Sequence, residues 1–383
     1  MSARRREGAP GARSDAARPA DPWRDARAIL CVRLDNLGDV LMTTPALRAL
    51  RRSARGRRIT LLASRAGAAL APYVPEVDEV VAYDAPWVKN AADDPAEDRR
   101  MIEALRQRNF DAAVIFTVYS QSPLPAAMMC RLAGIPRVLA HAHENPYRLL
   151  SHWVRDPEPG QYVRHEVQRQ LDLVATVGAA CTDTRLSFAT QDADRRSLGA
   201  ILAAYGLGGG QGWIVAHCGA SAPSRRYNPA LYARAISLLH GCGLKILLTG
   251  GPGECALTAG ILAQCTVRSH VIDLAGRLTL GELACLIEDA RLLISNNTGP
   301  AHIAAAVGTP LVDLYALTNP QHQPWQVPHR LLYHDVPCRN CYSSVCREGT
   351  HACLEGVDPR RVVAAAHELL AWRAGVSPRP LVA

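Results

Sequence analysis

One stretch near the C-terminal end constrains the fold of this chain more than any other. It reads LLISNNTGPAHIAAAVGTPLVDLY and runs from Leu292 to Tyr315. Its first apolar run predicts a buried strand, the polar residues that follow predict a turn, and Pro300 suits the first turn of a helix. Gly308 is typical of a helix C-cap, and a second buried strand follows at 310–315. The pattern predicts a strand–turn–helix–strand unit. Its turn would offer backbone N–H groups and a helix dipole to an anion.

The rest of the chain repeats this alternation of strand and helix in two halves, separated by the Gly-rich residues 206–212. In the first half we expect strands at 28–34, 59–63, 79–83, 112–116 and 137–140, and helices at 40–52, 125–133 and 165–177, with a further helix ending near 108. In the second half we expect strands at 213–217, 245–249 and 271–274, and helices at 229–240, 254–264 and 280–290. Such alternation is typical of a parallel sheet with helices on both faces. The predicted fold is therefore α/β, with two Rossmann-like domains facing a cleft where ligands bind beyond the strand ends.

The domain bounds follow from shifts in composition. Residues 1–27 are rich in Arg, Ala, Pro and Asp and have no apolar core, so we expect a disordered tail and not a secretory signal. Residues 28–180 would form the first domain and 181–335 the second. Residues 336–383 would hold a Cys-rich segment and a C-terminal helix at 359–372, which we expect to fold back on the first domain.

Composition narrows the classes of partner. A chain of 383 residues has room for two full cores, and its net charge is +8. The arginines are scattered and no basic stripe with interleaved aromatic residues accompanies them, so we expect no nucleic acid partner. No run of about 18 apolar residues predicts a membrane span. Most of the twelve cysteines are spread singly, which is typical of reduced thiols in a cytoplasmic protein.

Asp39 is the first candidate for chemistry, because it lies at the predicted strand-to-helix turn of the first domain. An acidic residue in this position often only stabilises the helix dipole. The alternative is a general base that removes a proton from an acceptor hydroxyl, although the position alone favours the helix-stabilising role.

Two further candidates lie in the second domain. Arg225 and Arg226 follow a predicted strand and could clamp a diphosphate, or could belong to a solvated loop. Gly251, Gly253 and Ala256 match a dinucleotide-binding fingerprint, which makes an NAD-dependent oxidoreductase a rival function. At the same turn Glu254 could instead bind the hydroxyls of a ribose.

Four blocks in order give the chain a resemblance to a known family. The segments CVRLDNLGDVLMTTPALRALR, AHCGASAPSRRYNPALYA, LLTGGPGE and ISNNTGPAHIAAAVGTPLVDLY resemble those of glycosyltransferase family 9, which includes the lipopolysaccharide heptosyltransferases. The resemblance covers roughly 29–370. It implies the GT-B fold, with an acceptor domain first, a nucleotide-sugar domain second and a C-terminal helix that returns to the first.

The resemblance also implies roles for individual residues. Asp39 matches the catalytic base and Glu254 the acidic residue that holds the ribose, while Arg225 or Arg226 would neutralise the diphosphate. Donor binding would further involve Asn297, Thr298, Gly299 and His302. Asn297 stands where the family commonly has Asp, which puts the donor sugar and the acceptor in question. No metal cofactor is expected.

The predicted reaction is inverting transfer of a sugar, heptose from ADP-heptose, to a lipopolysaccharide-core or other envelope glycolipid. The acceptor-binding residues stay unassigned. The enzyme would be cytoplasmic, with possible peripheral contact at the inner membrane face. Alternatives are a transferase that glycosylates a secondary metabolite with another nucleotide sugar, the NAD-dependent oxidoreductase, and a non-catalytic binding protein.

A cluster of cysteines lies near the C-terminus, at Cys338, Cys341, Cys346 and Cys353. Its spacing loosely suggests a structural zinc site but lacks the paired C-x2-C arrangement, so reduced structural thiols are the alternative.

Overall fold

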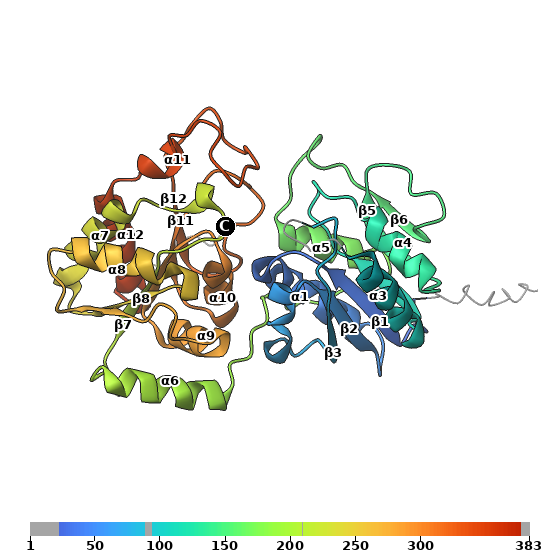
Figure 1. Ribbon diagram of the computed structural model, residues 1–383, viewed down its shortest axis with the longest axis horizontal. Helices are drawn as coiled ribbons and strands as arrows, with labels where there is room; N and C mark the ends of the chain where they lie inside the picture. The colour runs from blue at the N-terminus through green and yellow to red at the C-terminus, as the bar shows by residue number, and fades with distance from the viewer. Residues whose placement is uncertain (1–22, 89–93, 209, 377–383) are drawn as a thin grey trace, which may run out of the picture.

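Each half of the chain forms one six-stranded sheet, and every strand pair is parallel (Figure 1). The computed structural model describes residues 23–88, 94–208 and 210–376. The first sheet has the order β3-β2-β1-β4-β5-β6, with β1 Ala28–Arg33, β2 Arg58–Ala63, β3 Glu79–Ala82, β4 Ala112–Ile115, β5 Val138–Ala142 and β6 His152–Arg155. The second has the order β12-β11-β10-β7-β8-β9, with β7 Trp213–His217, β8 Lys245–Thr249, β9 Val271–Asp273, β10 Leu292–Asn296, β11 Leu311–Leu314 and β12 His329–Leu332.

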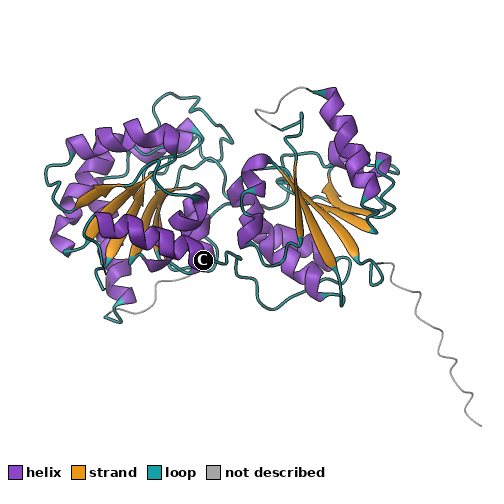
Figure 2. Cartoon of the chain, turned by 60° about the horizontal axis from the view of Figure 1, so that its bottom comes forward, coloured by secondary structure: helices purple, strands orange, loops and turns teal. Residues whose placement is uncertain are grey.

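Helices cover both faces of each sheet (Figure 2). The first domain carries α1 Leu37–Arg52, α2 Arg65–Ala68, α3 Pro95–Gln107, α4 Leu124–Leu132 and α5 Glu166–Ala175. The second carries α6 Asp192–Ala204, α7 Pro229–Leu238, α8 Cys255–Gln264, α9 Leu280–Asp289, α10 Gly299–Val307, α11 Ala352–Glu355 and α12 Pro359–Arg373. Apolar residues alternate between the faces of the central strands: Ile29 and Cys31 join the core beneath α1, whereas Leu30 and Val32 join the core beneath α4. This confirms the predicted α/β fold with two Rossmann-like domains.

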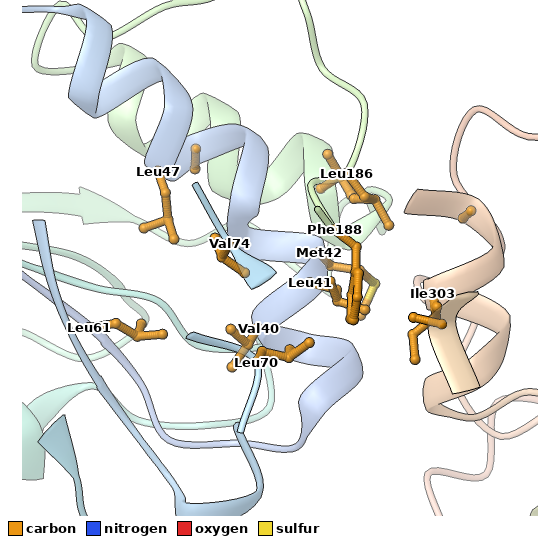
Figure 3. Packing of buried hydrophobic residues seen from close by; sticks show 14 of the residues in the cluster. Val40, Leu41, Met42, Leu47, Leu61, Leu70, Val74, Leu186, Phe188 and Ile303 are labelled. Atoms are coloured by element: carbon orange, nitrogen blue, oxygen red, sulfur yellow. The ribbon is translucent and has the colours of Figure 1, made fainter. Parts of the chain in front are cut away.

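The cores of the two domains are continuous with each other. Leu41 and Met42 on α1 of the first domain belong to the same buried apolar cluster as Ile303 on α10 of the second. Leu186 and Phe188, from the segment between the domains, lie in this cluster as well (Figure 3). Apolar burial therefore holds α1 against α10, which brings the two turns that precede these helices together.

Five of the helices and strands given above were not predicted: the strands β6 and β12, helix α6, and the one-turn helices α2 and α11. Strands β6 and β12 lie at sheet edges and are only partly buried, so their sequences lack the continuous apolar run by which a buried strand is recognised. Helix α6 precedes the Gly-rich break and packs on α9 of the second domain. Within it, Arg195 pairs with Glu288 and Asp289. Residues 1–22 of the predicted tail at 1–27 lie outside the described residues, whereas Trp23 and Ala26 are buried in the apolar core.

The C-terminal helix does not return to the first domain, so that part of the predicted fold is wrong. Helix α12 packs against α7, β10, β11 and β12, all in the second domain. Val362, Ala366 and Leu369 are fully buried there. The chain leaves β12 at the edge of the second sheet, so the shortest path for an amphipathic helix leads back over the same sheet. Among the described residues, no helix is long and apolar enough to cross a membrane.

Candidate active site

The site lies where the strand order of each sheet reverses. In the first sheet β1 lies beside β4, and in the second β10 lies beside β7. Connections that leave two such strands in opposite directions open a crevice at their carboxyl ends. A cleft of about 740 Å³ lies there, lined by Asp35 and Gln121 of the first domain and by Ser221, Arg225 and Ser344 of the second.

Arg33, the last residue of β1, is the electrostatic centre of the first-domain side. Its side chain is fully buried, and its guanidinium pairs with Asp35 at 3.0 Å, Asp39 at 3.2 Å and Glu166 at 2.8 Å. A buried guanidinium is stable only when carboxylates compensate its charge. Arg33 thereby fixes the position of both Asp35 and Asp39. No sequence argument had selected it, although it stands inside the CVRLDNLGDV block.

Asp39 is placed at the start of α1, with its carboxylate held in a defined orientation. One oxygen accepts a hydrogen bond from the backbone N–H of Asn36, at 3.1 Å, and the other accepts one from Arg33. Burial raises the pKa of this carboxyl, but the positive charge of Arg33, with that of Arg225 further away, brings it below its ordinary value. Asp39 is therefore ionised at neutral pH, as a general base must be.

Two histidines of the second domain lie on the other side of Asp39. His322 Nε2 is 3.9 Å from the Asp39 carboxylate. His302, on α10, packs so closely on α1 that a Cβ added at Gly38 would lie 2.7 Å from its ring. Burial lowers the pKa of His302 to about 3 and also lowers the pKa of His322. Both rings are therefore neutral at pH 7, and His302 stands where the sequence placed it, on the helix after the turn.

A loop of the second domain carries His322 to this position by docking on the first domain. Gln321 accepts a hydrogen bond from the backbone N–H of Glu166, at 3.0 Å. The Trp325 ring contacts His165 in a tilted arrangement, with 4.4 Å between the ring centroids and 35° between the ring planes. The segment His322-Gln323-Pro324-Trp325 thus joins the domains and completes the surroundings of Asp39.

Two neighbouring asparagines, Asn296 at the end of β10 and Asn297 in the turn that follows, have different partners. Asn296 is fully buried, accepts a hydrogen bond from Tyr227 N–H and donates to the carbonyls of Cys218 and Gly219. It therefore ties the loop after β7 to β10. Asn297 is also buried and lies beside the hydroxyl of Tyr315, which donates to the Asn319 carbonyl. The family commonly has Asp at position 297, and that carboxylate would lie beside the buried phenol of Tyr315.

Thr298 and Gly299 form the N-terminal end of α10 and are both half-buried. Gly299 faces the first domain: a Cβ added there would lie 3.2 Å from the Leu37 side chain. The positive end of the α10 dipole therefore points to the junction with α1, close to the Asp39 turn.

The two arginines of the second domain differ in position. Arg225 lines the cleft, donates to Asn319, and its positive charge lowers the pKa of Asp39 and His302. Arg226 is exposed and donates to the Ala220 carbonyl at 2.8 Å. The structure therefore brings only Arg225 to the Asp39 side of the cleft.

Glu254 lies at the turn after β8 and contacts the loop after β7 at Gly219. Its carboxylate accepts a hydrogen bond from the backbone N–H of Gly251, at 2.9 Å. It lies so close over Gly219 that an added Cβ there would clash with it. The glycines of the fingerprint are thus used to close a turn around Glu254.

These features coincide with a match to a known family. A profile described as "Glycosyltransferase family 9 (heptosyltransferase)" matches residues 98–352, about two thirds of the chain. The chain belongs to glycosyltransferase family 9. It is therefore a glycosyltransferase, and the oxidoreductase alternative is set aside.

Relatives of this family 9 enzyme support the assignment. Lipopolysaccharide heptosyltransferase 3 of Escherichia coli is 26% identical over 284 residues, covering 74% of this chain and 81% of the relative. Lipooligosaccharide heptosyltransferase 2 of Haemophilus ducreyi is 34% identical over 158 residues, covering 39% and 44% of the two chains.

Solved structures show the same fold. A family 9 glycosyl transferase from Veillonella parvula superposes with a TM-score of 0.75 at 23% identity, covering 91% of this chain and 98% of that one. The ADP-heptose lps heptosyltransferase II of E. coli gives a TM-score of 0.72 at 22% identity, covering 91% and 99%. The family 9 enzyme thus has the GT-B fold.

The Cys-rich segment of the family 9 enzyme closes over one end of the cleft. Tyr342 hydrogen-bonds Tyr119 of the first domain through their hydroxyls, and the backbone N–H of Asn340 donates to Leu317. Burial and then the neighbouring thiols raise the pKa of Cys353, although a backbone hydrogen bond opposes them. Among the described residues, no three His, Cys, Asp or Glu side chains are placed to hold a metal ion. The zinc site stays a prediction.

Proposed function

We propose that this family 9 enzyme transfers heptose from ADP-heptose to a hydroxyl of a lipopolysaccharide-core or other envelope glycolipid, with inversion at the anomeric carbon. The ionised carboxylate of Asp39, held by Arg33 at the junction with α10, is the observation that carries the proposal. The bacterial relatives named as lipopolysaccharide or lipooligosaccharide heptosyltransferases support the choice of donor and acceptor.

In the proposed mechanism Asp39 accepts the proton of the acceptor hydroxyl as its oxygen attacks the anomeric carbon. The bond between that carbon and the diphosphate oxygen breaks on the opposite face, so the configuration inverts and ADP leaves. Arg225 and the N-terminal end of α10, at Thr298 and Gly299, would stabilise the charge that grows on the diphosphate. Glu254 would hold the ribose of the donor once it turns from Gly251.

Asn297 and His302 would form part of the wall of the donor pocket. The exposed Arg226 would contribute only a long-range positive charge. Within this proposal the two domains keep the predicted division at residue 181. A glycolipid acceptor is anchored in a membrane, so the enzyme would be cytoplasmic and would contact the inner membrane face peripherally.

Two measurements test the proposal. Purified enzyme is incubated with ADP-heptose and inner-core lipopolysaccharide from a strain that lacks core heptose, and product mass and anomeric configuration are read out. A thermal-shift panel of ADP-, GDP- and UDP-sugars, with NAD as control, then identifies the nucleotide. Stabilisation by ADP-heptose with a gain of one heptose supports the proposal. Stabilisation by another sugar nucleotide only would favour a transferase acting on a secondary metabolite, and donor binding without transfer would favour a binding protein.

A further inference from the structure

Asp35 is a second carboxylate at the site, and the proposed mechanism leaves it without a role. It follows β1 directly and lines the 740 Å³ cleft. It also lines an adjoining cavity of about 290 Å³, whose walls include Trp87, Phe116 and Gln121. Asp39 lines neither of these two cavities, although its hydrogen-bond partner Asn36 lines the cleft. Asp84 also lines the cleft, but of the three carboxylates that pair with Arg33 it is Asp35 that lines both cavities.

The partners of Asp35 leave part of its hydrogen-bonding capacity unused. Gln121 donates to one carboxylate oxygen at 2.6 Å. The other oxygen is 3.0 Å from Arg33 Nε, but that N–H is not aligned for a hydrogen bond with any partner among the described residues. An ionised carboxylate can accept about four hydrogen bonds, so this oxygen can accept one from a ligand in the cleft.

Arg33 sets the spacing between the two carboxylates. Asp35 pairs with its Nε and Asp39 with its Nη2, which are neighbouring nitrogens on one edge of the guanidinium. The two carboxylates therefore present oxygens side by side. Hydroxyls on adjacent carbons of a sugar ring present two O–H donors at a similarly short separation.

On this geometry, and resting on the proposed function, we propose that Asp35 binds the hydroxyl next to the one that reacts. The acceptor would then be a sugar with a vicinal diol, one hydroxyl delivered to Asp39 and the other to Asp35. Gln121 orients Asp35, and the side wall at Trp87 gives the ring an apolar surface to lie on. Asp35 is a binding residue that determines specificity for the acceptor, whereas Asp39 takes the proton.

Burial raises the pKa of Asp35 to about 6, although Arg33 opposes this and Asp39 adds to it. At neutral pH the ionised form therefore prevails. As an acceptor-only group, it would favour a ligand that donates a hydrogen bond over one that only accepts.

The test uses synthetic glycosides of the acceptor's terminal sugar, one intact and one with the neighbouring hydroxyl replaced by hydrogen. For wild type we expect the deoxy glycoside to show a KM about tenfold to a hundredfold higher, the usual effect of a lost hydrogen bond to a charged group. Asp35→Asn should raise the KM of the intact glycoside by a similar factor with little change in kcat. It should also no longer distinguish the two glycosides. Gln121→Leu keeps the Asp35 carboxylate but removes the hydrogen bond that orients it. This variant should show a smaller difference in KM between the two glycosides than wild type does.

Glu166→Gln is the matched control, since Glu166 also pairs with Arg33 but is fully buried away from the cleft. It should lower the melting temperature and still distinguish the two glycosides. A loss of kcat on Asp35→Asn as large as that of Asp39→Asn would overturn the proposal, and so would unchanged distinction by Asp35→Asn. If wild type transfers no sugar, the proposed function fails, and direct binding of the two glycosides measured by NMR still decides the role of Asp35.

Discussion

His322 lies 3.9 Å from the carboxylate of Asp39, although the two residues come from different domains and are separated by most of the chain. The contact exists because the loop at 321–325 is docked on the start of α5. The base of the proposed reaction is thus fully assembled only when both domains meet.

Replacing Asp39 with Asn should lower kcat by about 10²- to 10⁴-fold, the usual contribution of a general base. Stabilisation by ADP should be nearly unchanged, because the hydrogen bonds of this carboxylate within the described structure go to Arg33 and to its own turn. Single-turnover kinetics and a thermal shift with ADP provide the two readouts. Retained turnover would rule out Asp39 as the base.

The pH profile should separate the two carboxylates. The pKa of Asp39 lies below its ordinary value of about 3.9, so the base stays ionised and kcat should be level from about pH 5 upward. The pKa of Asp35 is about 6, so kcat/KM for the acceptor should fall as the pH drops below about 6. Asp35→Asn should remove this fall. A profile of kcat/KM that is level down to pH 5 in wild type would contradict the assignment.

Arg225 and Arg226 form a matched pair for testing the diphosphate site. Arg225→Ala should reduce kcat/KM by about a hundredfold, as is typical when a group that stabilises a leaving charge is removed. Arg226→Ala should stay close to wild type, because its side chain is exposed and bonds only a loop carbonyl. Steady-state kinetics with varied ADP-heptose measures both. Equal losses would indicate that the loop moves Arg226 into the site.

Asn296 should prove structural, in contrast to its neighbour Asn297. Asn296→Ala leaves the backbone groups of Tyr227, Cys218 and Gly219 without their buried partner. We expect a loss of about 1–3 kcal/mol in the free energy of unfolding for an unsatisfied group, measured by urea denaturation. Asn297→Ala should instead change KM for the donor more than stability.

The parts of the site that the sequence could predict are those whose signal is local. Asp39, Thr298 and Gly299 lie at strand-to-helix turns, and both the helical periodicity and the family blocks mark such positions. The roles of Arg33 and His322 were not predicted because they depend on contacts between distant elements. In the sequence, Arg33 is only part of a predicted strand and His322 only part of a polar loop. The same reason explains the wrong placement of α12, since an amphipathic helix does not itself specify which domain covers its apolar face.

Gly38 gives the sharpest test of the contact between domains. It lies in the first turn of α1, where a Cβ would come within 2.7 Å of the His302 ring on α10. At such a distance either the buried His302 ring or one of the two helices must shift, so Gly38→Ala should disturb the junction and reduce kcat/KM by about tenfold or more. Gly199, inside α6, has nothing within 4 Å of an added Cβ, so Gly199→Ala should leave activity unchanged and stabilise the helix by about 0.5–1 kcal/mol. Combining Gly38→Ala with His302→Ala removes the clash, and partial recovery of KM for the acceptor relative to Gly38→Ala alone would show that the approach of α1 to α10 sets activity. An unimpaired Gly38→Ala enzyme would instead mean that catalysis tolerates a looser junction than the one seen here.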